Sequence, residues 1–172
     1  TCDGAFYRDK VVAVIGGGNA AVEEAVFLTR FASKVYIVHR RDQLRADRIL
    51  QERALANPKV EVIWESHLKK ILGTGQVEEI VVENKNTQER TSIPLAGVFF
   101  YIGAVPNTVF CEGVIDLDDR DFILTDEKLM TSLPGVFAAG DCRANQLKQV
   151  TVAVGEGALA AVEAERYVEE YF

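Results

Sequence analysis

The sequence predicts an α/β protein with a Rossmann-like parallel sheet, a small antiparallel β-meander and part of a second α/β domain. Apolar strand patterns alternate with helical patterns over residues 11–64, which is typical of a parallel sheet joined by right-handed crossovers. Short strand patterns separated by glycine and asparagine turns follow over residues 68–93, which is typical of hairpins. The last third predicts turns followed by one long helix rich in Ala, Val and Glu.

The first part of the chain predicts three strands and two helices in alternation. The β-branched run Val11–Ile15 predicts a buried strand, and Asn19–Phe31 predicts a helix with small residues on one face. Val35–Val38 predicts the second strand, Leu44–Leu55 the second helix and Val60–Trp64 the third strand.

The middle of the chain predicts a meander that covers one face of this sheet. Its strands are expected at Leu68–Leu72, Val77–Glu83 and Arg90–Ile93, and a further apolar strand is expected at Leu95–Ile102. The tail predicts a strand at Gly135–Asp141, which ends in Gly-Asp, and one helix over residues 149–171.

The composition is that of a globular protein. The 172 residues are 48% hydrophobic and 26% charged, and the net charge of −7 argues against a nucleic-acid surface. No apolar run approaches the roughly 18 residues of a membrane span. The chain has three cysteines, Cys2, Cys111 and Cys142, and they are widely spaced. An odd number of cysteines without close pairs favours a reducing compartment, so we expect a cytoplasmic protein.

The glycine run after the first strand fits a dinucleotide fingerprint, Gly16-x-Gly18-x-x-Ala21. Gly16 permits a tight turn, Gly18 lets a pyrophosphate approach the backbone, and Ala21 lets the helix sit close to the strand. The pyrophosphate would then lie on free N–H groups of the helix start, which also includes Asn19 and Ala20. The alternative is a tight strand–helix turn without a ligand.

The end of the second strand indicates which dinucleotide is bound. His39, Arg40 and Arg41 stand where an NAD site has an acidic residue for the ribose hydroxyls, and Arg45 follows one turn later. A 2′-phosphate would repel a carboxylate but forms charge-assisted pairs with guanidinium groups, so the sequence predicts NADPH. The alternative is a solvated basic edge. His39 either hydrogen-bonds the phosphate or shapes the turn.

Four stretches together resemble the low-molecular-weight thioredoxin reductase family: residues 2–28, 38–46, 101–108 and 135–141. The resemblance covers nearly all of the chain. It implies a hinge with half of a redox motif at residues 1–7, an NADPH-binding domain at 8–100 and the C-terminal part of an FAD-binding domain at 101–172. We therefore expect a piece of a longer protein with an incomplete FAD site.

The resemblance also implies residue roles. Cys2 would be the second cysteine of a Cys-x-x-Cys disulfide, and Asp3 the acid that protonates the thiolate or the flavin. Gly140 and Asp141 would reach the ribityl chain and phosphate of FAD, although Gly-Asp is also an ordinary strand-ending turn. The other implied cofactor contacts are Gly103, Lys148, Gln149 and Val150. Many family members have Ser or Thr in place of Ala20 and Arg in place of Lys148.

The implied reaction passes electrons from NADPH to FAD, then to the disulfide that includes Cys2, and then to thioredoxin or a thioredoxin-like protein. The family is usually homodimeric, and we expect the chain alone to be inactive. Two alternatives stay open. One is a reductase of the same fold that serves a peroxidase or uses another electron donor, and the other is a regulatory NADPH-binding module without catalysis.

Overall fold

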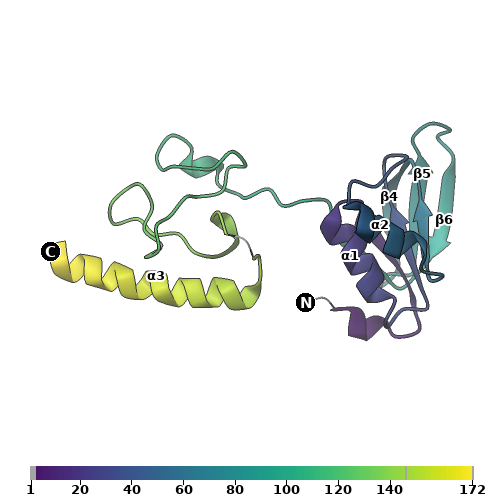
Figure 1. Cartoon of the computed structure of the whole chain (residues 1–172), viewed down its shortest axis with the longest axis horizontal. Helices are drawn as coiled ribbons and strands as arrows, with labels where there is room; N and C mark the ends of the chain where they lie inside the picture. Colours follow the sequence, from purple (N-terminus) through teal and green to yellow (C-terminus); the bar gives the residue numbers. More distant parts are fainter. Residues whose placement is uncertain (1–2, 146, 172) are drawn as a thin grey trace. The chain divides into compact units, whose positions relative to one another are not determined.

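The computed structural model describes residues 3–145 and 147–171, and the contacts within the chain divide it after Gly103 into two compact units (Figure 1). The first unit contains both sheets and two helices, and the second contains one long helix and a series of turns. Each unit is described by itself.

A parallel sheet of four strands forms the centre of the first unit. Its strands are β1 (Val11–Gly16), β2 (Lys34–Val38), β3 (Val60–Ile63) and β7 (Gly97–Tyr101), in the order β3-β2-β1-β7. Ile15 pairs with Val38 on one side, and Gly16 pairs with Tyr101 on the other. The carboxyl end of β1 therefore lies between the ends of two neighbours, which is where ligands bind open α/β sheets.

Helices cover one face of this sheet. The helices α1 (Asn19–Leu28) and α2 (Arg48–Leu55) lie against it, and Val12 and Val14 of β1 belong to a buried core with Ala21, Ala25 and Leu28 of α1. Small residues at the α1 positions that face the strand allow this close approach.

The meander covers the opposite face, as the sequence predicts. Its strands β4 (Ser66–Leu72), β5 (Glu79–Asn84) and β6 (Arg90–Pro94) are antiparallel in chain order. Ala13, which points away from Val12 and Val14 because strand side chains alternate, is buried with Val38, Ile80 and Val82. The predicted α/β architecture is confirmed.

Two helix boundaries differ from the prediction. The second helix begins at Arg48 and not at Leu44, because the backbone N–H groups of Arg45 and Ala46 donate to the carbonyl of Gly17 at 2.7 and 3.1 Å. Residues 44–47 are thus held as a loop against the glycine turn. The first helix ends at Leu28, and residues 29–31 continue it only as turns.

The second unit contains the expected long helix but not the expected strand. The helix α3 (Val150–Tyr171) follows two 3-10 helices, η2 (Val109–Cys111) and η3 (Gly140–Cys142). Residues 135–141 make a single bridge, from Phe137 to Met130, and then turn at Gly140, whose φ is 79°. The described residues from 104 onward offer only isolated bridges, so this extended run has no neighbouring strand to pair with. None of the described helices is both long and apolar enough to span a bilayer.

Replacement of Ile80 by Ala tests how strongly the meander depends on its contact with the sheet. Ile80 is 0% exposed, so Ile80→Ala should lower the free energy of unfolding by about 2–5 kcal/mol. Ile71, which is also in the meander, is 43% exposed, and Ile71→Ala should cost well under half of that amount. Urea unfolding followed by circular dichroism measures both, and equal losses would show that the meander is not packed as described.

Candidate functional site

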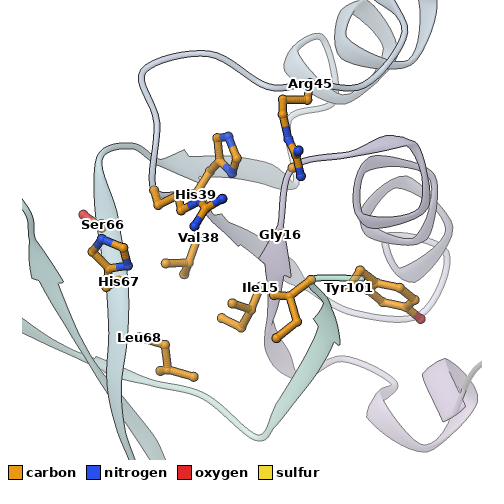
Figure 2. Close-up of a pocket in the computed structure, with 12 residues that line it drawn as sticks. Ile15, Gly16, Val38, His39, Arg45, Ser66, His67, Leu68 and Tyr101 are labelled. Carbon is orange, nitrogen blue, oxygen red and sulfur yellow. The ribbon is translucent and has the colours of Figure 1, made fainter. Parts of the chain in front are cut away.

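A cavity of about 340 Å³ lies at the carboxyl ends of β1, β2 and β7 (Figure 2). In the view of Figure 2, His39 and Arg45 border its upper side, while His67 and Leu68 of β4 lie to the left. Its volume is within the range of small-molecule sites. The lining residues are Ile15, Gly16, Gly17, Val38, His39, Arg40, Arg45, Ser66, His67, Leu68, Tyr101 and Ile102.

The first glycine of the turn fits between a strand and a helix. Gly16 has a φ of 150°, and a Cβ there would overlap the carbonyl oxygen of Tyr101 and lie 2.9 Å from the Cβ of Ala21. Only glycine fits this position without a shift of β7 or α1.

Gly18 differs, because a Cβ there would meet no atom within 4 Å. It is the N-cap residue of α1 and provides no side-chain cap, so the N–H groups of the first turn remain available to a ligand. Ala20 lies in this first turn, and Ala21 lies beneath it in the core.

Gly17 has a role that the sequence analysis missed. A Cβ at Gly17 would overlap the imidazole ring of His39, so this glycine allows the ring to lie against the backbone of the turn. The contact links residues from two different strand ends, and no local sequence signal marks it.

His39 is buried and shapes this turn. Burial lowers the pKa of His39, and the carbonyls of Gln43 and Gly16 only partly oppose this effect; the positive charges of Arg45 and Arg41 lower it further. The ring is therefore neutral near pH 7. Its Nε2 is buried and has no hydrogen-bond partner among the described residues.

The arginines gather around the cavity without acidic partners. Arg40 and Arg45 line it, whereas Arg41 is exposed beside them and lies outside the lining. Within the described residues, none of the three forms an ion pair. This part of the first unit therefore has three free guanidinium groups, which suits an anionic ligand.

The Asn19 side chain is used within the protein. Its Nδ2 donates to Oδ2 of Asp47 at 2.8 Å, and its Oδ1 accepts the backbone N–H of Asp47 at 2.8 Å. Both polar atoms of this side chain therefore already have a partner within the protein.

The cavity also contains residues that the sequence analysis did not single out: Ser66, His67, Leu68, Tyr101 and Ile102. They come from β4 and from the end of β7, which the parallel register and the meander bring to the glycine turn. Gly103, with a φ of 102°, directly follows Ile102. Only the topology of the folded unit could have pointed to the β4 residues, whereas Tyr101 and Ile102 begin the stretch 101–108 that resembles the family.

The predicted FAD-binding residues from Gly140 onward lie in the second unit, around the start of α3. The N–H of Gly140 donates to Glu156 at 2.7 Å, and a Cβ on Gly140 would lie 3.2 Å from that of Ala153. Asp141 is exposed and forms no hydrogen bond or ion pair within the described residues. Gln149 immediately precedes α3 and accepts the N–H of Ala153 at 3.0 Å, and Val150, the first residue of α3, is exposed.

Glu156 and Arg143 are further residues of this region that the sequence analysis missed. Burial raises the pKa of Glu156, but hydrogen bonds from Gly140, Arg143 and Asn145 outweigh it, and the pKa lies below its ordinary value. Arg143 binds this carboxylate at 2.8 Å. The Lys148 ammonium donates a hydrogen bond to the carbonyl of Arg143 at 2.5 Å. It also lies 4.0 Å from the centre of the Phe122 ring.

Of the two predicted redox residues, Asp3 lies within the part of the chain that the structure describes. Cys2 lies outside the described residues. Asp3 begins the 3-10 helix η1 (Asp3–Tyr7), and its side chain is exposed. The described residues contain no cluster of His, Cys, Asp or Glu that would hold a metal ion.

Comparison with known proteins identifies the family. The sequence pattern of the pyridine nucleotide-disulphide oxidoreductases matches residues 2–157. The chain belongs to this family.

The most similar relatives agree with the resemblance to low-molecular-weight thioredoxin reductases, which is confirmed. Thioredoxin reductase from Peptoclostridium acidaminophilum is 47% identical over 100% of this chain and 56% of its own length. Thioredoxin reductase from Listeria innocua is 46% identical over 98% of the chain and 53% of its own length. The chain thus spans about half the length of the curated relatives it matches.

Solved structures show the same likeness. The thioredoxin reductase of Streptococcus pyogenes is 48% identical, with a TM-score of 0.89 over 99% of this chain and 56% of its own. That of Giardia duodenalis is 36% identical, with a TM-score of 0.80 over 98% of this chain and 56% of its own.

Two glycine substitutions test the geometry of the turn. Gly17→Ala should lower the free energy of unfolding by about 1–3 kcal/mol, because the buried ring of His39 must move. Gly18→Ala should leave the thermal midpoint unchanged, because the new methyl group meets no atom within 4 Å. Scanning calorimetry compares them, and a Gly18→Ala protein as unstable as Gly17→Ala would contradict this arrangement.

Proposed function

We propose that the first unit binds NADPH, with the pyrophosphate on the turn from Gly16 to Ala21 and the 2′-phosphate on Arg40, Arg41 and Arg45. The observation that carries the proposal is the group of three unpaired guanidinium groups beside a glycine turn at the carboxyl end of the central strand. His39 supports the turn as a neutral ring.

The charge of the cavity favours NADPH over NADH. None of the described residues that line it carries a carboxylate, and an acidic residue at the end of β2 is what a dinucleotide site uses to bind an unmodified ribose. A 2′-phosphate brings about two negative charges, for which arginine forms paired, charge-assisted hydrogen bonds. The open N–H groups at the start of α1 suit the pyrophosphate.

For the whole protein, we propose a flavoprotein disulfide reductase of the thioredoxin reductase type. Residues 1–7 would carry half of the redox motif, residues 8–100 the NADPH site and residues 101–172 part of an FAD site. The names of the relatives and the half-length match support this assignment. We expect it to act in the cytoplasm as a homodimer.

The second unit offers groups that fit FAD. Asp141 has a free carboxylate that can accept hydrogen bonds from ribityl hydroxyls, and Oδ1 of Asn145 is a buried oxygen without a partner among the described residues. The remaining contacts from this unit would come from Gly140, Lys148, Gln149 and Val150. FAD, when bound, supplies two-electron chemistry between a nicotinamide and a disulfide.

The redox residues of this chain would complete the path to the protein substrate. Cys2, in a disulfide with a second cysteine, would receive the electrons and pass them to thioredoxin or a thioredoxin-like protein by thiol–disulfide exchange. Asp3, exposed at the start of η1, would carry the proton.

Charge reversal at the arginines tests the nucleotide assignment. The double variant Arg40→Glu, Arg41→Glu should weaken NADPH binding about 100-fold or more, because charge-assisted hydrogen bonds to the 2′-phosphate are lost. NADH binding should change far less. Isothermal titration calorimetry measures both affinities, and Arg53→Glu, an exposed arginine on α2, is the control. Equal losses for the two nucleotides would remove the argument for NADPH.

The chain alone should bind NADPH but should not catalyse disulfide reduction. Its first unit supplies the whole cavity, whereas the chain spans about half the length of the relatives that are named reductases. Calorimetry with NADPH and an assay of NADPH-dependent reduction of a thioredoxin disulfide, with added FAD, test the two parts. Rapid turnover by the chain alone would contradict the second part.

A further inference from the structure

We infer that Asn19 and Asp47 form a clasp that positions the arginine segment, residues 39–46, and so sets the preference for NADPH over NADH. The inference rests on the proposed nucleotide site and adds a positioning pair to it. Neither side chain needs to touch the nucleotide.

The clasp joins the starts of two helices. Asn19 is the first residue of α1, and Asp47 is the N-cap residue of α2. Nδ2 of Asn19 donates to the Asp47 carboxylate, and Oδ1 of Asn19 accepts the Asp47 backbone N–H, both at 2.8 Å. Two hydrogen bonds from one planar amide fix the orientation of residue 47 relative to α1.

The carboxylate of Asp47 is not used where an N-cap residue normally uses it. An Asp at this position usually accepts an N–H of its own helix. Here it makes no side-chain cap bond, and the N–H groups of Leu50 and Gln51 donate to the backbone carbonyl of Asp47 at 2.9 and 3.1 Å. The side chain therefore serves the neighbouring helix, next to the glycine turn.

Other bonds also attach this end of the arginine segment to its neighbours. The N–H groups of Arg45 and Ala46 donate to the carbonyl oxygen of Gly17, and Nε2 of Gln51 on α2 donates to the carbonyls of Leu44 and Ala46 at 3.4 and 2.7 Å. None of these bonds joins the segment to α1 itself. The clasp provides that link, from Asp47 to Asn19.

The orientation of the arginine segment matters more for binding of the 2′-phosphate than for binding of the rest of the nucleotide. Paired guanidinium–phosphate hydrogen bonds depend strongly on geometry, and Arg45 lies two positions before the clasp. Contacts of the pyrophosphate with the start of α1 do not depend on this segment. Loss of the clasp should therefore weaken NADPH more than NADH.

The charge of Asp47 allows geometry to be separated from electrostatics. Its carboxylate adds a negative charge near a site for an anion, so removal of the charge alone should not weaken phosphate binding. Asp47→Asn keeps an oxygen that can accept from Asn19, whereas Asp47→Ala removes the acceptor.

The experiment compares the affinities of these variants of the full chain for NADPH and NADH by calorimetry. Asp47→Ala should weaken NADPH binding about 5- to 10-fold, the effect of losing roughly one hydrogen bond, and should change NADH binding less than about 2-fold. Asp47→Asn should keep the wild-type ratio of the two affinities or raise it. Glu52→Ala is the matched control, since it removes one carboxylate and one hydrogen bond, from Arg48, on the same helix.

A second variant keeps the test valid if Asp47→Ala does not fold. Asn19→Ala removes both bonds of the clasp, whereas Asp47→Ala leaves the bond from the backbone N–H of residue 47, so Asn19→Ala should lower the NADPH-to-NADH ratio at least as much. The double variant should lose no more than Asn19→Ala alone, because Asp47→Ala removes only a bond that Asn19→Ala has already removed.

Several results would overturn the clasp. They are equal effects on both nucleotides, no effect of Asp47→Ala or Asn19→Ala on the ratio, and loss of the preference in Asp47→Asn as well. A wild-type chain that fails to prefer NADPH would instead overturn the proposed function. A wild-type ratio that falls in Arg40→Glu, Arg41→Glu but is unchanged in Asp47→Ala and Asn19→Ala would overturn the clasp alone.

Discussion

The close approach of β7, the glycine turn and α1 is the constraint on which the first unit depends. A side chain on Gly16 would overlap the Tyr101 carbonyl and approach Ala21, and a side chain on Gly17 would overlap His39. Because these positions carry none, the start of α1 lies directly at the edge of the sheet with its N–H groups open. The same turn presents the Gly17 carbonyl to the arginine segment. One tight turn thus brings together the two parts of the proposed site, the open N–H groups for a pyrophosphate and the arginines for a further phosphate.

The grouping of three unpaired arginines marks this site. Some cations elsewhere in the first unit have carboxylate partners: Lys34 binds Glu61, and Lys69 and Arg90 both bind Glu83. Arg40, Arg41 and Arg45 have none among the described residues, although Asp42 stands within the same segment. Burial keeps His39 neutral, so the positive charge resides on the guanidinium groups alone. Unpaired cations around a concave site are expected where a ligand supplies the anion.

Local patterns in the sequence predicted the parts of this unit whose structure is local. The apolar run of β1, the glycine fingerprint and the hairpin turns of the meander all lie where they were expected. The second helix was predicted four residues too early, because the Gly17 carbonyl binds two N–H groups that a helix would otherwise use. The strand at residues 135–141 was wrong because a strand needs a partner, which local propensity does not supply. The contact of Gly17 with His39, and that of Asn19 with Asp47 across 28 positions, link distant residues and leave no periodic signal.

The two units differ in how much of a site each contains. In the first unit, residues of one compact body line the whole cavity and bury two cores, one on each face of the sheet. Among the described residues of the second unit, the buried apolar cluster consists of Cys111, Ile115, Ile123 and Ala138, while Phe110 and Val150 are 80% and 78% exposed. Large apolar side chains at a surface mark contacts with further protein, which agrees with a chain that spans about half the length of its relatives. In the proposed function, nucleotide binding is therefore a property of the first unit, and the proposed flavin contacts at Gly140 and Asp141 lie in a unit with a small core.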